Sequence, residues 1–180
     1  ILNKFTRVVR DLSQQLGKSI ELIIEGKDVE LDKTILEAIN DPLTHLVRNS
    51  VDHGIETPAE REQMGKNATG KIILRAFHDA GQVNLVISDD GKGLDPDKIA
   101  VSAVEKGLMT EQQVDAMSEK QKMELILLPG FSTAKEVTDV SGRGVGMDVV
   151  TTNIESLGGI IELDSTPGEG TDIQIKLPLT

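Results

Sequence analysis

The sequence contains no cysteine, tryptophan or tyrosine, and phenylalanine occurs only three times. Without cysteine, the chain can form neither disulfides nor thiolate metal sites. With so few aromatic rings, base stacking is excluded as the main way of recognising a nucleotide or a single strand. The core must therefore be built from aliphatic side chains.

Positive charge and long apolar runs are also scarce. Lysine and arginine total 19 against 30 aspartates and glutamates, which gives a formal net charge of -11. Such an acidic surface repels phosphate backbones, so we expect no nucleic-acid partner. No apolar run approaches the ~18 residues needed to cross a bilayer, so we expect no membrane insertion. The 180 residues predict a single domain over residues 1–180, and because the chain starts at Ile1 rather than Met we expect a fragment of a larger multidomain protein.

Apolar periodicity and turn residues predict helices that alternate with strands. Helices are expected over 2–17, 32–39, 42–54, 95–106, 110–128 and 145–157, with Pro42 in the first turn of the third. Strands are expected over 20–24, 71–78, 82–89, 160–165 and 172–177, with Ala80-Gly81 as a hairpin turn. The stretch between Pro129 and Gly144 lacks periodicity and is predicted to be a functional loop. Together these elements predict an α+β fold, a two-layer α/β sandwich with helices on one face of a mixed, mostly antiparallel sheet.

The segment 45–54 (HLVRNSVDHG) is the first of three motifs that could carry chemistry. On an α-helix, its polar residues fall within ~140° of arc, opposite an apolar face; they are His45, Arg48, Asn49, Asp52 and His53. A solvated polar stripe is one explanation, but such stripes usually hold long Glu and Lys side chains. We therefore predict a ligand-binding face. Asn49 offers a neutral oxygen to a Mg²⁺ ion that substrate phosphates and waters already ligate, and Asp52 could orient a neighbouring ligand or water.

The second motif, Asp89-Asp90-Gly91-Lys92-Gly93, follows a predicted strand. Asp89 shares its parity with three apolar strand residues, so its side chain should point inward. A buried carboxylate needs donors, and the exocyclic amine of adenine is a suitable one. The alternative is an ordinary Asp-Gly turn that precedes a helix capped by Asp95.

Glycines dominate the third motif, Gly142-Arg143-Gly144-Val145-Gly146-Met147. Backbone N–H groups of such a run, placed before a helix, can point at a phosphate. A loop without a chemical role is an equally good explanation of the glycines alone. Gly168, Gly170 and Thr171 can likewise be explained as an ordinary hairpin turn, and Lys98 as a solvated lysine, although it could reach phosphate oxygens.

Taken in order, the motifs resemble those of the GHKL group of ATP-binding domains, and the first is most similar to the N box of the CheA-type chemotaxis histidine kinases. Residues 129–133 (PGFST) are similar to the phenylalanine box of that family, and residues 141–150 to its second glycine box. The segment 176–180 is similar to the seam with a receptor-coupling domain. The resemblance covers essentially the whole chain.

The resemblance implies a Bergerat-type sandwich in which Mg-ATP lies between the N-box helix and a mobile ATP lid, roughly residues 128–144. It assigns adenine recognition to Asp89, Mg²⁺ binding to Asn49, lid anchoring to Phe131 and, less directly, phosphate contact to Lys98. His45 and His53 would approach the phosphates or the water shell of the metal, and glycines would frame the triphosphate. The remaining residues of the implied nucleotide site are Arg48, Asp52, Gly91, Gly93, Ser132, Thr133, Gly142, Gly144, Gly146, Met147 and Thr171.

His45 stands where gyrase, MutL and chaperone relatives place a glutamate that activates water. The resemblance therefore implies phosphoryl transfer rather than hydrolysis, with His45 and Asn49 as catalytic residues. None of the three histidines is a convincing acceptor, so the acceptor is expected to be a histidine on a separate phosphotransfer domain of the same protein, in a dimer.

By the same resemblance, the protein would act in cytoplasmic two-component signalling, with chemoreceptors and a coupling protein reached through domains outside this fragment and response regulators downstream. Two alternatives stay open at this point. One is an ATP-hydrolysing GHKL switch, and the other is a nucleotide-sensing module that transfers nothing.

Overall fold

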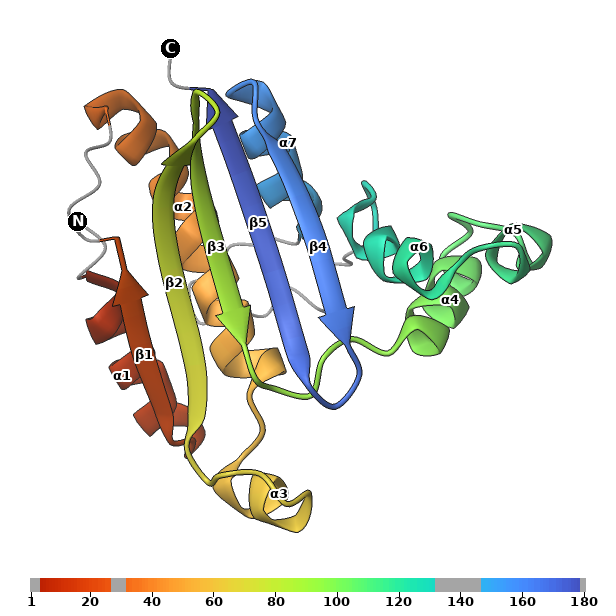
Figure 1. The fold of residues 1–180 in the computed structure, drawn as a ribbon. Helices are drawn as coiled ribbons and strands as arrows, with labels where there is room; N and C mark the ends of the chain where they lie inside the picture. The colour runs from red at the N-terminus through yellow and green to blue at the C-terminus, as the bar shows by residue number, and fades with distance from the viewer. Residues whose placement is uncertain (1–3, 27–31, 132–146, 179–180) are drawn as a thin grey trace.

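The computed structural model describes residues 4–26, 32–131 and 147–178, and it contains one five-stranded sheet with the order β1-β2-β3-β5-β4. The strands are β1 (Ile20–Glu25), β2 (Gly70–Asp79), β3 (Gln82–Asp89), β4 (Ile160–Thr166) and β5 (Gly170–Pro178). Only the β1–β2 pair is parallel among these strands; the other three pairs are antiparallel (Figure 1). The predicted mixed, mostly antiparallel sheet is therefore confirmed.

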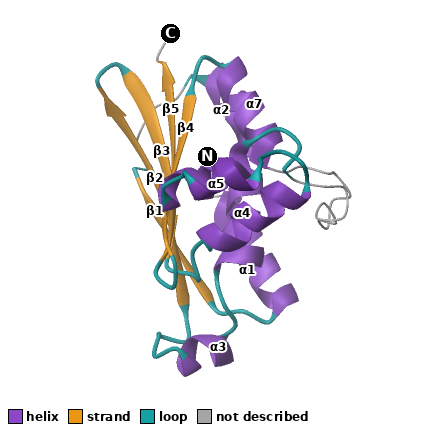
Figure 2. Ribbon diagram, turned by 90° about the vertical axis from the view of Figure 1, so that its right-hand side faces the viewer, coloured by secondary structure: helices purple, strands orange, loops and turns teal. Residues whose placement is uncertain are grey.

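The helices lie on one side of this sheet, as Figure 2 shows. They are α1 (Lys4–Leu16), α2 (Lys33–Asn49), α3 (Pro58–Gln63), α4 (Pro96–Glu105), α5 (Glu111–Asp115), α6 (Glu119–Glu124) and α7 (Met147–Ser156). A π-helical turn, η1 (Ser50–Gly54), continues α2, and a short 3-10 turn, η2 (Leu125–Leu127), continues α6. The two-layer sandwich is confirmed.

The core fills the space between the layers and is almost entirely aliphatic, as the composition requires. Alternate positions of β2, β3 and β5 supply its sheet side, because successive strand residues point to opposite faces. The helix side comes mainly from α1, α2 and α7. Its most deeply buried members include Phe5, Ile39, Leu43, Leu46, Val47, Val51, Ile72, Leu74, Val83, Leu85, Ile87, Val150, Ile154, Ile175 and Leu177.

Two local predictions are confirmed in detail. Ala80 and Gly81 both have positive φ, 51° and 75°, which is the conformation of a two-residue turn whose twist matches a β-hairpin. Asp32 caps α2 by accepting a hydrogen bond from the Thr34 N–H at 3.0 Å.

The break predicted before Pro42 is wrong, because Pro42 lies inside the continuous helix α2. Its missing N–H leaves the carbonyl of Ala38, four residues earlier, without its helical donor. The proline ring is buried together with Ile39 and Leu43, so packing against the core compensates for the lost hydrogen bond. The predicted end of the helical segment at Gly54 is confirmed, although its last five residues form the π turn η1.

The helix predicted over 110–128 is divided into α5, α6 and η2, since Thr110 and Ser118 each begin a new capping box. The helix α3 has no counterpart in the predicted elements. Its signal was present, because Thr57 accepts from the backbone of Glu60 while the Glu60 carboxylate accepts from Thr57, and Pro58 occupies the first turn.

Candidate nucleotide-binding site

The helix α2 carries the first motif, and it delivers His45, Arg48 and Asn49 at partly buried positions of its last turns. Leu46 and Val47, between them, are fully buried and fix the helix against the sheet. The Nε atom of Arg48 is buried and has no hydrogen-bond partner among the described residues. A buried donor without a partner costs free energy, so an anionic ligand that accepts a hydrogen bond there would be stabilised.

The end of the motif lies on the π turn η1, a rare conformation that often occurs at functional sites. Asp52 and His53 are both exposed there, with their Oδ2 and Nε2 atoms 3.6 Å apart. The Lys18 ammonium at the end of α1 donates to the carbonyls of Val51 and Asp52 at 2.7 and 2.6 Å. Burial lowers the pKa of Lys18, although Asp52 works against the change. Lys18 was not predicted from the sequence, and it holds the turn that presents His53.

The inward orientation of Asp89 is confirmed, because this residue ends the core-facing row of β3 that includes Leu85 and Ile87. Burial raises the pKa of the Asp89 carboxyl from 3.8 to about 6. Hydrogen bonds from the Gly91 N–H, at 2.9 Å, from the Ser50 side chain and from the Thr171 backbone hold the carboxylate and oppose that rise. Asp89 is therefore a fixed, poorly solvated acceptor between η1 and the sheet.

Around Asp89, three glycines each allow the backbone of another segment to approach closely. A Cβ atom on Gly91 would lie 2.1 Å from the carbonyl oxygen of Gly54, and one on Gly93 would lie 2.4 Å from the Thr166 oxygen. Gly170 has a φ of 138°, and its Cβ would lie 2.0 Å from the Asp89 oxygen. The glycines of the second motif thus have a structural reason that does not depend on a ligand. Thr171, next to Gly170, pairs with Asp89 in the β3–β5 register and its Oγ1 lies 3.0 Å from Ser165 Oγ.

The third motif meets the first through Met147, which begins α7. The Asn49 side-chain amide donates to the Met147 sulfur at 3.7 Å, and Met147 is buried. This bond uses the nitrogen of Asn49 and leaves its carbonyl oxygen to accept other partners or a cation. Ser132, Thr133, Gly142, Gly144 and Gly146 lie outside the described residues.

Phe131 packs against the core, and Lys106 at the end of α4 holds it twice. The Lys106 ammonium donates to the Phe131 carbonyl and lies 4.3 Å from the centre of its ring, which is a cation–π contact. The chain before the third motif is therefore attached to α4 at this point.

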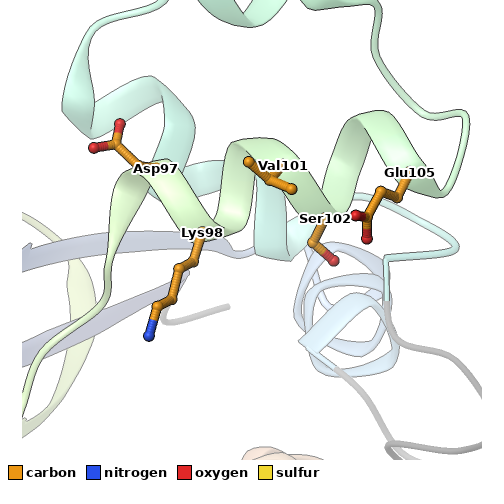
Figure 3. Close-up of a pocket in the computed structure, with 5 residues that line it drawn as sticks. All are labelled: Asp97, Lys98, Val101, Ser102 and Glu105. Carbon is orange, nitrogen blue, oxygen red and sulfur yellow. The ribbon is translucent and has the colours of Figure 1, made fainter.

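Lys98 occupies an exposed position on the first turns of α4. It borders a hollow of about 280 Å³ with Asp97, Val101, Ser102 and Glu105, as Figure 3 shows. No hydrogen bond or ion pair among the described residues links Lys98 to α2. Because Lys98 is the only predicted site residue in its lining, this hollow is not the site around Asp89.

Sequence reasoning missed the residues that support Asp89 from below. Ser50 is buried and hydrogen-bonds Asp89. Glu56, Arg61 and Lys66 lie around the turn that follows Asp89. Arg61 is 1% exposed, which no periodicity predicts for an arginine in a six-residue helix. The only available signal was the capping box that begins α3.

Residues 38–180 match the family model described as "Histidine kinase-, DNA gyrase B-, and HSP90-like ATPase". The chain belongs to this ATPase family. Over all 180 residues it is 57% identical to the sensor histidine kinase CheAY of Helicobacter pylori and 48% identical to the chemotaxis protein CheA of Bacillus subtilis. It spans 22% and 27% of the length of these two relatives. The resemblance to the CheA-type histidine kinases within the family is therefore confirmed.

Solved structures support the same fold. The histidine kinase domain of the blue-light activated kinase EL346 from Erythrobacter litoralis aligns with a TM-score of 0.56 and 17% identity, over 97% of this chain and 63% of that one. The catalytic domain of histidine kinase ThkA aligns with a TM-score of 0.51 and 22% identity, over 99% of this chain and 93% of that one. None of the helices in the described parts of this ATPase domain is long and apolar enough to cross a bilayer.

Proposed function

We propose that this domain binds Mg-ATP and transfers the γ-phosphate to a histidine on a separate phosphotransfer domain, in chemotaxis two-component signalling. The observation that carries the proposal is the buried carboxylate of Asp89. It is held by Ser50 and Gly91, and Gly54 is its close neighbour, since a Cβ there would lie 3.1 Å from Asp89 Oδ2. A glycine beside a buried acceptor leaves room for a flat donor such as the adenine amine.

The donor set on α2 suits the other end of the nucleotide. Among the described residues there is no cluster of three or more His, Cys, Asp or Glu side chains that could form a protein cage for a metal. Mg²⁺ is commonly held by one or two protein oxygens together with substrate phosphates and waters, and the carbonyl oxygen of Asn49 fits that role. When bound, Mg²⁺ would neutralise charge on the transferring phosphoryl group. The Nε of Arg48, which has no hydrogen-bond partner in the described parts of the chain, offers a further donor on the same helix.

Phosphoryl transfer depends on positioning more than on covalent chemistry by the protein. In the proposed reaction, an imidazole nitrogen of the acceptor histidine attacks in line with the γ-phosphate, and ADP leaves. His45 would orient or deprotonate that imidazole, and His53, aligned beside Asp52, would approach the phosphates. We assign Phe131, Ser132, Thr133 and the glycines 142, 144 and 146 to closure over the triphosphate, with Lys98 as a phosphate contact.

Calorimetric titrations of three proteins test the binding part of the proposal. Wild type should bind Mg-ATP, Asp89→Ala should abolish binding, and Asn49→Ala should weaken it only when Mg²⁺ is present. Incubation with radiolabelled ATP and a histidine-containing acceptor domain tests the transfer. Labelled acceptor supports the kinase, free phosphate without acceptor would indicate a hydrolytic switch, and binding without either would indicate a sensor.

By the same proposal, the acceptor domain belongs to the same protein and is phosphorylated within a dimer. Chemoreceptors and a coupling protein would act through other domains, and response regulators would receive the phosphoryl group in the cytoplasm. The support is the high identity to proteins named CheA of which this chain spans about a quarter. Separate expression of those domains with this one would test each partner.

A further inference from the structure

A cluster of four charged side chains lies under the turn that follows Asp89. The Arg61 guanidinium donates from Nη1 to Glu56 Oε1 at 2.9 Å and from Nη2 to Asp90 Oδ2 at 3.1 Å. The Lys66 ammonium donates to Glu56 Oε2 at 2.7 Å. Glu56 thus bridges two cations, and its two oxygens fix them side by side. We call Glu56, Arg61, Lys66 and Asp90 the turn cluster.

Both cations of the turn cluster also bond to the backbone of the turn. Arg61 Nη1 donates to the Asp90 carbonyl at 3.2 Å, and Lys66 donates to the carbonyls of Asp90 and Gly91 at 3.2 and 2.9 Å. Lys71 N–H donates to Asp90 Oδ1 at 2.8 Å from the neighbouring strand. The Asp90 N–H also donates to the Lys71 carbonyl at 3.2 Å, so the backbone just beyond the end of β3 is held both by side chains of the turn cluster and by the neighbouring strand.

The position of this backbone determines the geometry around Asp89. The Gly91 N–H that donates to Asp89 Oδ1 belongs to the same peptide unit as the Asp90 carbonyl, which accepts from both cations. In addition, Lys92 N–H donates to the Gly54 carbonyl at 2.9 Å, which joins the turn to η1. A shift of the turn would therefore move both the Gly91 N–H that donates to Asp89 and the Gly54 backbone that lies beside the Asp89 carboxylate.

The charges of the turn cluster cancel, with two cations and two carboxylates. Burial alone would raise the pKa of Glu56, but the hydrogen bond and charge of Lys66 and the charge of Arg61 hold it below its usual value. The side chains of Arg61 and Glu56 are 2% and 4% exposed, so the two ion pairs of Glu56 are shielded from water, whereas the Asp90 side chain is 44% exposed. A neutral cluster exerts little net field on a distant ligand and acts through geometry.

We infer that Arg61 and Lys66 are positioning residues for adenine recognition, which they support by fixing the Asp90–Gly91 turn beside Asp89. This inference rests on the proposed function, because it assumes that Asp89 receives the adenine. A cluster that only stabilises the fold would affect every part of the nucleotide alike. A positioning role affects the adenine end and spares the phosphate end.

Lys66→Met is the informative variant, since the Lys66 side chain is 19% exposed and its loss leaves Arg61 paired. We would titrate Mg-ATP and Mg-tripolyphosphate by calorimetry into wild type, Lys66→Met and the control Lys176→Met. Lys176 pairs with Glu162 at 3.3 Å on β4 and β5, with its side chain 31% exposed. The expected result is that Lys66→Met weakens ATP about tenfold, as the loss of charge-assisted bonds would, and tripolyphosphate less than about twofold. The control should match wild type.

Equal weakening of both ligands by Lys66→Met, or no weakening, would overturn the inference and leave the proposed function intact. Failure of folded wild type to bind ATP would overturn the proposed function and the inference with it.

A second variant is Asp90→Asn, which keeps the size of a side chain that is 44% exposed and weakens the hydrogen bond from Arg61. It should likewise weaken the binding of ATP more than the binding of tripolyphosphate. Amide hydrogen exchange gives a readout without ligand. The Gly91 N–H should exchange about tenfold faster in Lys66→Met than in the control, and an unchanged rate would overturn the inference.

Discussion

The side-chain amide of Asn49 lies 3.7 Å from the sulfur of Met147, although the two residues are 98 positions apart in the sequence. This bond joins the end of α2 to the start of α7, and it orients the Asn49 carboxamide by occupying its nitrogen. The metal-binding assignment of Asn49 therefore depends on a residue of the third motif. Mutation can therefore test two roles of Asn49 separately, the binding of a metal through its oxygen and the contact with Met147 through its nitrogen.

Asn49→Ala should weaken Mg-ATP on the order of tenfold, equivalent to about 1.4 kcal/mol, because it removes the proposed oxygen ligand. The effect should disappear when titrations are made with EDTA in place of Mg²⁺. Met147→Leu keeps the apolar volume and loses the sulfur acceptor, so it tests the orienting bond by itself, and it should weaken Mg-ATP less than Asn49→Ala does. Equal losses with and without Mg²⁺ would argue that Asn49 has a packing role alone.

The free energy of unfolding should depend on pH through the ionisation of Asp89. Because the folded-state pKa of Asp89 is raised to about 6, its contribution is fully present below about pH 4 and is lost as pH rises through 6. Asp89→Asn lacks this titration. Relative to wild type, the variant should gain on the order of 2–3 kcal/mol in free energy of unfolding between pH 4 and pH 7. Urea unfolding at several pH values measures this, and parallel pH profiles would contradict the assignment.

Nucleotide binding should shift the same titration in the opposite direction. If the adenine amine donates to Asp89, the ionised form is favoured and the pKa of Asp89 should fall below 6 when the site is filled. NMR titration of the Asp89 carboxyl with and without saturating adenosine measures this directly. Adenosine is preferred to ATP there because it carries no phosphate that titrates near pH 6. An unchanged pKa would place the adenine elsewhere.

Gly91→Ala should unfold or severely destabilise the domain, by about 3 kcal/mol or more. The new Cβ would lie 2.1 Å from the Gly54 carbonyl oxygen, and neither backbone can move away while the Gly54–Lys92 bond is kept. Gly168→Ala isolates backbone strain, because Gly168 has a positive φ of 82° and nothing within 4 Å of an added Cβ, whereas the φ of Gly91 is not positive and only the overlap is added there. It should cost only about 1–2 kcal/mol. Thermal unfolding of both variants distinguishes steric overlap from backbone strain.

His45→Ala should lower phosphorylation of an acceptor domain about 100-fold at saturating ATP, since a positioned general base contributes at least about that factor. Affinity for Mg-ATP should change only a few-fold. His78→Ala, at an exposed position of β2, should behave as wild type. Unchanged phosphorylation in His45→Ala would remove the catalytic assignment.

Particular residues show where sequence reasoning succeeds. The row Val83, Leu85 and Ile87 alternates strictly, so the parity that buries these three also predicts the inward orientation of Asp89, which is partly buried. The Ala80-Gly81 turn is equally local, because its two positive φ values depend only on the turn type. Such features are determined by residues within one element and its neighbour.

Other features depend on contacts that no local pattern contains. Pro42 normally ends a helix, and only burial against Ile39 and Leu43 keeps α2 continuous. Arg61 is charged and belongs to a helix of six residues, and its buried guanidinium is bonded by Glu56, Asn67 and Asp90, which lie 5, 6 and 29 positions away. The order of the three motifs identifies a site, but the supports of that site are tertiary.

The β3 strand carries one further consequence. Asp89 is the last position of a row whose other members form the centre of the core, so the proposed nucleotide-binding region and the hydrophobic interior share the strand β3. A ligand bound at Asp89 should stabilise the folded state, including the core, and raise the melting temperature by mass action. Conversely, truncating the fully buried Leu85 to alanine, four residues before Asp89 in the same row, should be detectable as lost affinity as well as lost thermal stability.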